Sequence, residues 1–191
     1  MVSLAAIAGC GSSGAERPLR LPGDYLPLPP GRGTAYRLPA ASPRVGARAP
    51  IDGYGCERGV PRARFGIHLE LYARRRVVPV PAGIGIAPPL RRQGAYVTGG
   101  ACSYPLRTRE PTGVFELRSG ALRLGTLFAV WGQPLSRRRL ADFSGPVTAY
   151  LGGRRWPGEP GAIPLRPHSE IVLEVGGHVS PHPRYLFPHG L

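Results

Sequence analysis

The 191-residue sequence contains no lysine and no asparagine. Its 25 basic residues are therefore all arginine, and only 11 acidic residues oppose them, which gives a formal net charge of +14 at pH 7. Lysine and asparagine both have A-rich codons, so their absence, together with 28 glycines and 24 prolines, indicates the codon pressure of a GC-rich genome. Arginine in place of lysine is consequently weak evidence for phosphate recognition, although arginine suits that task.

Recognisable catalytic motifs are also missing. The sequence has no GxSxG elbow, no HExxH helix, no Ser-x-x-Lys pair and no P-loop. It has no CxxC pair, which argues against a thiol oxidoreductase and a zinc ribbon. No segment approaches the ~20 apolar residues of a membrane span. We expect a protein without catalytic activity or cofactor; a hydrolase lacking a known motif is the enzymatic alternative.

Near the N-terminus, Ile7-Ala8-Gly9-Cys10 resembles a bacterial lipobox, in which small residues precede a cysteine that receives a lipid. The following Gly-Ser-Ser-Gly stretch is typical of a flexible tether. Residues 1–10 carry no basic residue and too short an apolar run, so we interpret them as a truncated signal remnant. The prediction is a lipid on Cys10 and a place on the extracytoplasmic face of the cell membrane. The alternative is a cytoplasmic chain that resembles a lipobox by chance.

Cys56 and Cys102 remain once Cys10 is assigned to the lipid. An even pair in an oxidising compartment predicts a disulfide, worth about 3–4 kcal/mol in the chain-entropy model. Two buried free thiols would be the expectation for a cytoplasmic chain.

The chain divides by composition into a tether and a domain. Residues 11–49 are rich in Pro, Gly and Arg and have few periodic apolar positions, so we expect a disordered tether. Residues 50–191 are long enough for one globular domain.

Strand patterns dominate residues 50–191 and predict a mainly β (α+β) fold, an antiparallel β-rich domain stapled by the disulfide. Alternating apolar residues and turn dipeptides mark the candidates. We expect strands near residues 65–72, 77–80, 94–98, 114–118, 147–151, 154–156 and 171–175. A weak internal repeat of strand, turn and strand would divide the domain into two related lobes.

One short amphipathic helix is expected. Leu124, Leu127, Phe128 and Trp131 form a single apolar stripe at helical spacing, and Gly132 is placed to end the helix. A second short helical turn is expected from Ser136 to Phe143.

Several stretches resemble a family of bacterial envelope proteins to which no activity is assigned. They are Ile51-Asp52-Gly53 with Cys56, His68-Leu69, Pro81 to Ile86, Cys102, Trp131 to Leu135, Gly145 to Ala149, Ile163 to Leu165, and Phe187-Pro188. The resemblance covers most of residues 50–191 and implies an envelope location without implying a function.

This chain departs from the family pattern at histidine positions. The family carries a His-X-His-X-His cluster that ends at His68, and here its earlier positions are Arg64 and Gly66. A His-Thr-His-Asp run corresponds to residues 107–110, Arg-Thr-Arg-Glu, and a further histidine corresponds to Glu116. The family cluster would suit Cu or Zn, because histidines that alternate along a strand share one face. One histidine of that set is kept here.

Two candidate binding sites follow. Arg64, Arg107 and Arg109 could form an anion-binding face, for which anionic lipid or an acidic cell-wall polymer would be the partner. We favour this first site and expect a binding protein without a metal. The second candidate is a metal site made by His68 and the C-terminal His178 and His182. The arginines are scattered without a known motif, so we expect no nucleic-acid binding. Nucleic-acid binding would become the alternative again if the protein were cytoplasmic. The sequence predicts no oligomeric state.

Overall fold

The fold is taken from a computed structural model that describes residues 50–191. The predicted lipidation site Cys10 and the predicted tether, residues 11–49, lie outside the described residues. Within residues 50–191, no helix is both long and apolar enough to span a bilayer.

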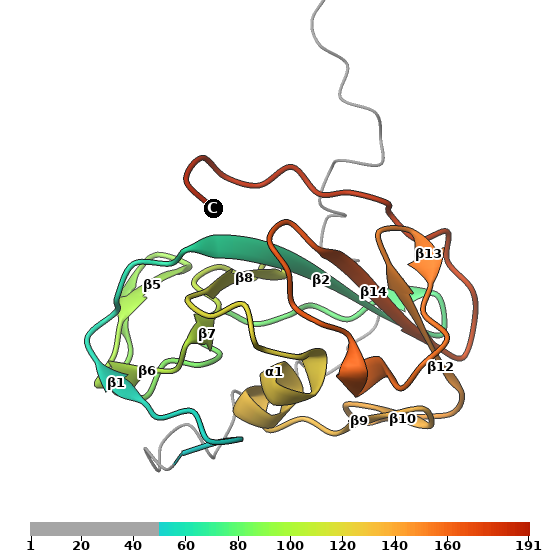
Figure 1. Ribbon diagram of the computed structural model, residues 1–191, viewed down its shortest axis with the longest axis horizontal. Helices are drawn as coiled ribbons and strands as arrows, with labels where there is room; N and C mark the ends of the chain where they lie inside the picture. The colour runs from blue at the N-terminus through green and yellow to red at the C-terminus, as the bar shows by residue number, and fades with distance from the viewer. Residues whose placement is uncertain (1–49) are drawn as a thin grey trace, which may run out of the picture.

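A seven-stranded sheet forms the centre of the domain (Figure 1). Its order is β13-β12-β14-β2-β8-β7, and β3 pairs with the end of β2. Neighbouring strands are antiparallel except for the central pair of β14 and β2, which is parallel. The strands are β2 (Phe65–Ala73), β3 (Arg76–Val77), β7 (Leu106–Arg107), β8 (Val114–Leu117), β12 (Val147–Leu151), β13 (Arg154–Arg155) and β14 (Glu170–Val175).

The mainly β fold is thus confirmed, and the two halves of the suspected repeat lie side by side in one continuous sheet. Strand β2 pairs with β8 in the first half, and β12 pairs with β14 in the second. Two tight turns join neighbouring strands of this sheet. Arg74 and Arg75 join β2 to β3 with φ angles of 50° and 65°, and Gly152 and Gly153 join β12 to β13 with 57° and 75°. Positive φ at both central residues matches the right-handed twist of a hairpin.

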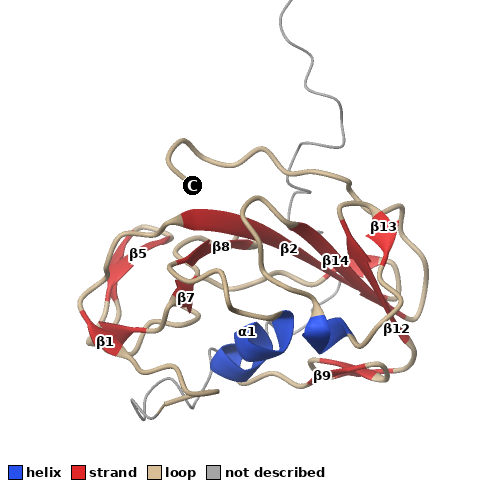
Figure 2. Cartoon of the chain, viewed as in Figure 1, coloured by secondary structure: helices blue, strands red, loops and turns tan. Residues whose placement is uncertain are grey.

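One face of the sheet packs on the hydrophobic core. Helix α1 (Leu124–Trp131) and the short 3-10 helix η3 (Pro160–Ala162) lie under this face (Figure 2). Leu124, Leu127 and Trp131 are fully buried there, and the helix ends at Gly132 in the left-handed region. The expected helix and its glycine cap are confirmed, because one stripe of apolar side chains at helical spacing can reach the core.

The second helical turn, expected from Ser136 to Phe143, is wrong. This segment forms a small three-stranded sheet in which Leu140 pairs with Leu135. The two-arginine turn brings the chain back on itself, and Leu140 then reaches the core as a strand residue. The strands are β9 (Leu135–Ser136), β10 (Arg139–Leu140) and β11 (Phe143–Ser144).

The predicted disulfide between Cys56 and Cys102 is present, with their Cα atoms 5.5 Å apart. It ties the start of the domain to the strand that precedes β7. Two further two-stranded sheets complete this end of the domain: β1 (Glu57–Arg58) with β6 (Cys102–Ser103), and β4 (Arg91–Gln93) with β5 (Tyr96–Gly99).

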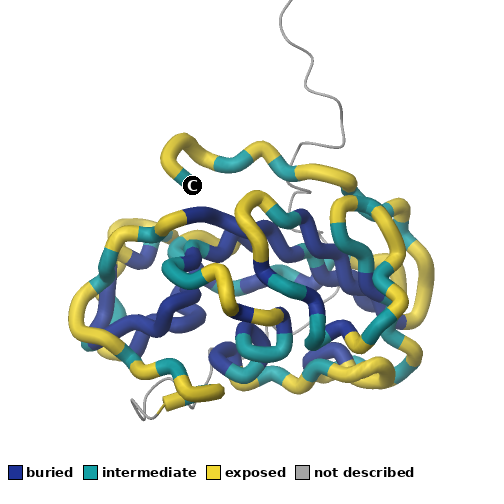
Figure 3. The backbone as a smooth tube through the Cα atoms, in the orientation of Figure 1, coloured by how far each residue is buried: buried dark blue, intermediate teal, exposed yellow. Residues whose placement is uncertain are grey.

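The other face of the central sheet is covered by the last 16 residues, 176–191, which we call the C-terminal tail. The tail has no helix or strand and runs over the sheet on the side opposite α1 (Figure 1). The cover explains why β2 is buried on both faces along nearly its whole length (Figure 3). At Gly66 an added Cβ would lie 2.9 Å from the Phe187 ring, so glycine lets the tail approach closely.

Candidate metal-binding site

Three ionisable side chains gather on the tail-covered face of the sheet. His68 and Glu70 are on β2, two positions apart, and Glu170 begins β14. The parallel register places Glu170 directly beside His68. Their Nδ1 and carboxylate atoms, one from each residue, lie within 4.8 Å of one another. The side chains of His68 and Glu170 are only 3% and 1% exposed, so water does not screen the charges of these side chains.

The C-terminal tail adds a second histidine. His182 Nδ1 lies 2.8 Å from both oxygens of the Glu70 carboxylate. Tyr185 stacks on the His68 ring, with centroids 3.8 Å apart and planes 17° apart. Tyr72 donates its hydroxyl to Glu70 Oε2 at 3.1 Å. We call His68, Glu70, Glu170 and His182 the central cluster.

A backbone carbonyl fixes the tautomer of His68. His68 Nε2 lies 2.9 Å from the Thr112 carbonyl oxygen, which can only accept, so Nε2 carries the proton. Nδ1 of the neutral ring therefore carries a lone pair. This lone pair points at Glu170, whose two oxygens lie 2.9 and 3.0 Å from Nδ1. Metal-binding histidines typically have this arrangement, because the outer hydrogen bond orients the ring and strengthens the ligand.

Burial decides the protonation states around Nδ1. Desolvation lowers the pKa of His68 to about 4, against the opposing charge of Glu70. Desolvation, with the nearby charge of Glu70, raises the pKa of Glu170 to about 9. At neutral pH His68 is neutral and Glu170 keeps a proton, which it donates to Nδ1. A positive ion at this point would replace that proton, because it favours the carboxylate and uses the imidazole electron pair.

The spacing of the donor atoms on His68, Glu70 and Glu170 is close to that around a tetrahedral ion. Zn²⁺ bonds of 2.0–2.2 Å to nitrogen and oxygen place neighbouring ligands about 3.4 Å apart. In the central cluster, His68 Nδ1 lies 2.9 Å from a Glu170 oxygen and 3.8 Å from Glu70 Oε1. The distance from Glu70 Oε1 to His182 Nδ1 is 2.8 Å. His68, Glu70 and Glu170 thus offer three donors within 4.8 Å of one another. His182 lies beside this group through its contact with Glu70, and it would have to turn toward the other two donors to become the fourth ligand.

His178 does not join this cluster. Its Nδ1 lies 3.1 Å from Glu174, which also accepts from the Tyr150 hydroxyl at 2.9 Å and from the Val179 amide at 2.8 Å. The His178 side chain is 64% exposed, whereas that of Glu174 is 6% exposed. Of the three histidines proposed from the sequence, the structure therefore brings together His68 and His182 and leaves His178 at a separate carboxylate.

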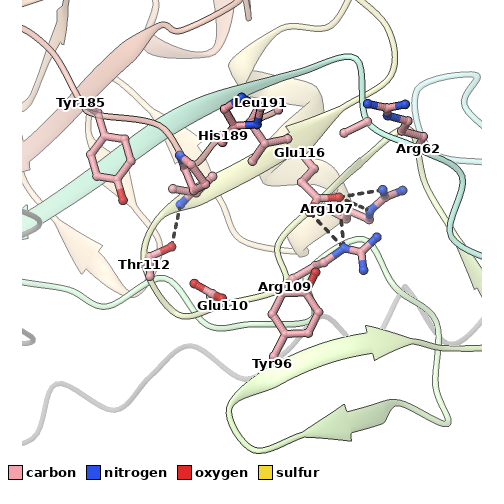
Figure 4. Close-up of a pocket in the computed structure, with 14 residues that line it drawn as sticks. Arg62, Tyr96, Arg107, Arg109, Glu110, Thr112, Glu116, Tyr185, His189 and Leu191 are labelled. Atoms are coloured by element: carbon pink, nitrogen blue, oxygen red, sulfur yellow. Dashed lines mark hydrogen bonds and ion pairs between the residues drawn. The ribbon is translucent and has the colours of Figure 1, made fainter.

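The predicted arginine face is mostly engaged by protein groups. Arg107 is buried and donates to Glu116 at 2.7 and 2.9 Å and to the Pro61 carbonyl at 2.6 Å. Arg109 also donates to Glu116, at 3.0 Å, and lies over the Tyr96 ring (Figure 4).

The two arginines border a pocket of about 430 Å³, whose lining also includes Thr112 and Tyr185, the residues that contact His68. Arg64 is exposed and does not line this pocket. The structure thus brings Arg107 and Arg109 together on Glu116, without Arg64.

Sequence reasoning missed the two carboxylates of the central cluster. Neither Glu70 nor Glu170 is among the candidate ligands that the sequence suggests. The tail buries this face, so Glu174 is 5% exposed and Glu170 only 2%. A usable signal was present: alternation places Glu170 and Glu174 on the face of their strand opposite the core, as it does for His68 and Glu70.

Comparisons with known proteins found no matching family model, no matching curated protein and no matching solved structure. The function must therefore be argued from the geometry of the site itself.

Proposed function

We propose that this protein binds one divalent transition-metal ion, with Zn²⁺ as the reference ion, through His68, Glu70, Glu170 and His182. The observation that carries the proposal is the Nδ1 lone pair of a buried histidine, which the Thr112 hydrogen bond orients toward a buried carboxyl group. Two imidazoles and two carboxylates are a donor set that suits Zn²⁺ and its neighbours in the first transition row.

The arginine face is the weaker candidate for the main ligand site. Arg107 already has a carboxylate and a carbonyl as partners, and Glu116 neutralises much of the positive charge that an incoming anion would meet. Desolvation by burial lowers the pKa of Arg107, and the charge of Glu116 opposes that effect. Arg107 and Glu116 therefore form an ion pair within the protein that largely compensates its own charges.

Four protein ligands favour holding the ion over using it in catalysis. Catalytic zinc sites keep one coordination position open for water or substrate, whereas sites with four protein ligands are closed. Here the fourth donor comes from His182, and Tyr185 covers His68 from the same side. The proposed role is thus metal handling without turnover.

The test uses the full chain with its disulfide intact, in chelator-free buffer. We expect calorimetry and metal analysis to give one tightly bound Zn²⁺ per chain. His68→Gln keeps a donor for the Thr112 carbonyl but loses the Nδ1 ligand, so affinity should fall by more than about 100-fold, beyond what outer-shell changes cost. His178→Ala is the matched control and should bind as the native chain does. No binding by the native chain, or unchanged binding by His68→Gln, would overturn the proposal.

We further propose that the protein works on the extracytoplasmic face of the cell membrane, tethered by a lipid on Cys10. The disulfide supports this location, because such bonds persist in oxidising compartments. Peptide mass spectrometry of the membrane fraction should find a diacylglyceryl group on Cys10. Cys10→Ser should move the protein to the soluble fraction. An unmodified Cys10 on a soluble native protein would contradict the proposed tether.

A further inference from the structure

The C-terminal tail contacts the rest of the domain at several points, two of which involve ligands of the proposed site. Near the end of the tail, the Leu191 carbonyl oxygen lies 2.8 Å from His168 Nε2, and the Phe187 ring lies beside the His168 ring. His182 reaches Glu70, Tyr185 stacks on His68, and the Val179 amide donates to Glu174. Each of these sheet residues is buried or nearly so, yet none of residues 176–191 is buried. Separate directed contacts therefore hold the tail, which has no fully buried residue of its own.

We expect such a segment to open more readily than the sheet beneath it. Local stability is low where a chain buries few apolar groups and has no hydrogen-bonded strand or helix, and both conditions hold for the tail. The three remaining donors of the central cluster differ, since His68, Glu70 and Glu170 are fixed on the two central strands of the sheet. The site thus has three rigid ligands and one on a segment that can leave.

We infer that the C-terminal tail is a metal-locked strap, closed over the ion by coordination through His182 and withdrawn to let the ion exchange. This inference rests on the proposed metal binding and adds its regulation. With the strap closed, four ligands surround the ion and Tyr185 shields His68. With the strap withdrawn, the ion keeps three protein ligands and one position becomes open to a chelating acceptor.

The coupling between ion and strap is reciprocal. Coordination by His182 stabilises the closed strap by the same free energy by which the closed strap stabilises the bound ion. Zn²⁺ should therefore order residues 176–191, and a strap that cannot coordinate should release the ion faster. The rigid part of the site keeps its ligands in both cases.

Hydrogen exchange of the full chain measures the first effect. We expect saturating Zn²⁺ to slow amide exchange in residues 176–191 by about tenfold or more. This is the lower end of the effect, about 10–100-fold, that a contact supporting a metal ligand has on metal affinity. In His182→Ala the same addition should leave exchange in the tail unchanged. His189→Ala is the matched control, because His189 is on the same tail but lines the neighbouring pocket (Figure 4), and it should respond as the native chain does.

Stopped-flow transfer of Zn²⁺ to EDTA measures the second effect. Release should be at least about tenfold faster from His182→Ala than from the native chain and from His189→Ala. If native protein binds Zn²⁺ tightly but its tail exchanges equally with and without the ion, the strap is wrong and metal binding stands. If the native chain binds no Zn²⁺, the proposed function fails and the strap fails with it.

Discussion

Replacing Glu170 by glutamine is expected to abolish Zn²⁺ binding while leaving the metal-free domain folded. The glutamine amide can donate to His68 Nδ1, as the protonated carboxyl group does over 2.9 Å in the native chain. The variant therefore keeps the shape and the hydrogen bond but cannot supply an anionic ligand. We expect the affinity measured by calorimetry to fall by more than about 100-fold, because a direct ligand is lost.

Glu174→Gln is the matched control for this prediction. Glu174 is on the same strand and is equally buried, but its partners are Tyr150, His178 and Val179. Its loss should leave Zn²⁺ affinity within about threefold of native, because no ligand of the ion is touched. Equal losses in the two variants would show that the affinity follows net charge on this face, which would contradict the assignment of Glu170 as a ligand.

The same variant should change how the stability of the metal-free protein depends on pH. Burial raises the pKa of Glu170 to about 9, so above the usual carboxyl pKa the folded state holds a proton that the unfolded state has lost. Stability must then fall as pH rises toward 9, by about 1.4 kcal/mol for each pH unit crossed. His68, whose pKa is lowered to about 4, has the opposite effect, and only below about pH 6.5.

Of Glu170 and His68, therefore, only Glu170 changes the stability of the metal-free protein between pH 7 and 9. Glutamine removes it, so metal-free Glu170→Gln should unfold at a higher temperature than native protein at pH 8, and the gap should narrow toward pH 6. Parallel curves for the two proteins would show that Glu170 is ionised in the native state.

Much of the fold follows from local patterns along the chain. The apolar stripe of Leu124, Leu127 and Trp131 predicts an amphipathic helix that ends at a glycine, and the structure contains this helix. The alternation in β2 and in β14 likewise shows which residues face the core. The helical prediction for residues 136–143 was wrong because this segment has too few apolar positions to distinguish a helical period from a strand period. Pairing with the adjacent strand residues determined its structure instead.

The site could be predicted only in part, because its members meet through long-range pairing. His68 and Glu170 are 102 residues apart in the chain and become neighbours only through the parallel register of β2 and β14. No local pattern specifies that pairing, since the expected sheet was antiparallel. His68 and His182 were named from the sequence as residue types that bind metals, but nothing in the sequence placed the tail over Glu70.

The family pattern suggested from the sequence would place its histidines along one strand, at the positions of Arg64, Gly66 and His68. The central cluster runs across strands instead, from His68 to Glu170, and up to the tail. A single histidine on β2 is compatible with a metal site for this reason: Glu70 on the same strand, Glu170 on the neighbouring strand and His182 on the tail supply the other donors.

Removing the disulfide should destabilise the domain without removing the metal site. Cys56 and Cys102 are 46 positions apart. In the chain-entropy model, freeing a loop of this size lowers the free energy of unfolding by about 4 kcal/mol, a large share of the 5–15 kcal/mol typical of a domain. Urea denaturation of Cys56→Ser/Cys102→Ser at 25 °C should show this loss, and Cys10→Ser, which keeps the bridge, should match the native chain.

The bridge and the metal ligands belong to different parts of the fold, so their contributions should separate. The disulfide fixes the segment before β2 to β6, whereas the ligands are on β2, β14 and the tail. Below its unfolding transition the double serine variant should therefore bind Zn²⁺ with near-native affinity, and Zn²⁺ should raise its midpoint by mass action. A variant that is folded by circular dichroism yet binds no Zn²⁺ would show that the bridge holds the site in register, and that the sheet alone does not position the three ligands.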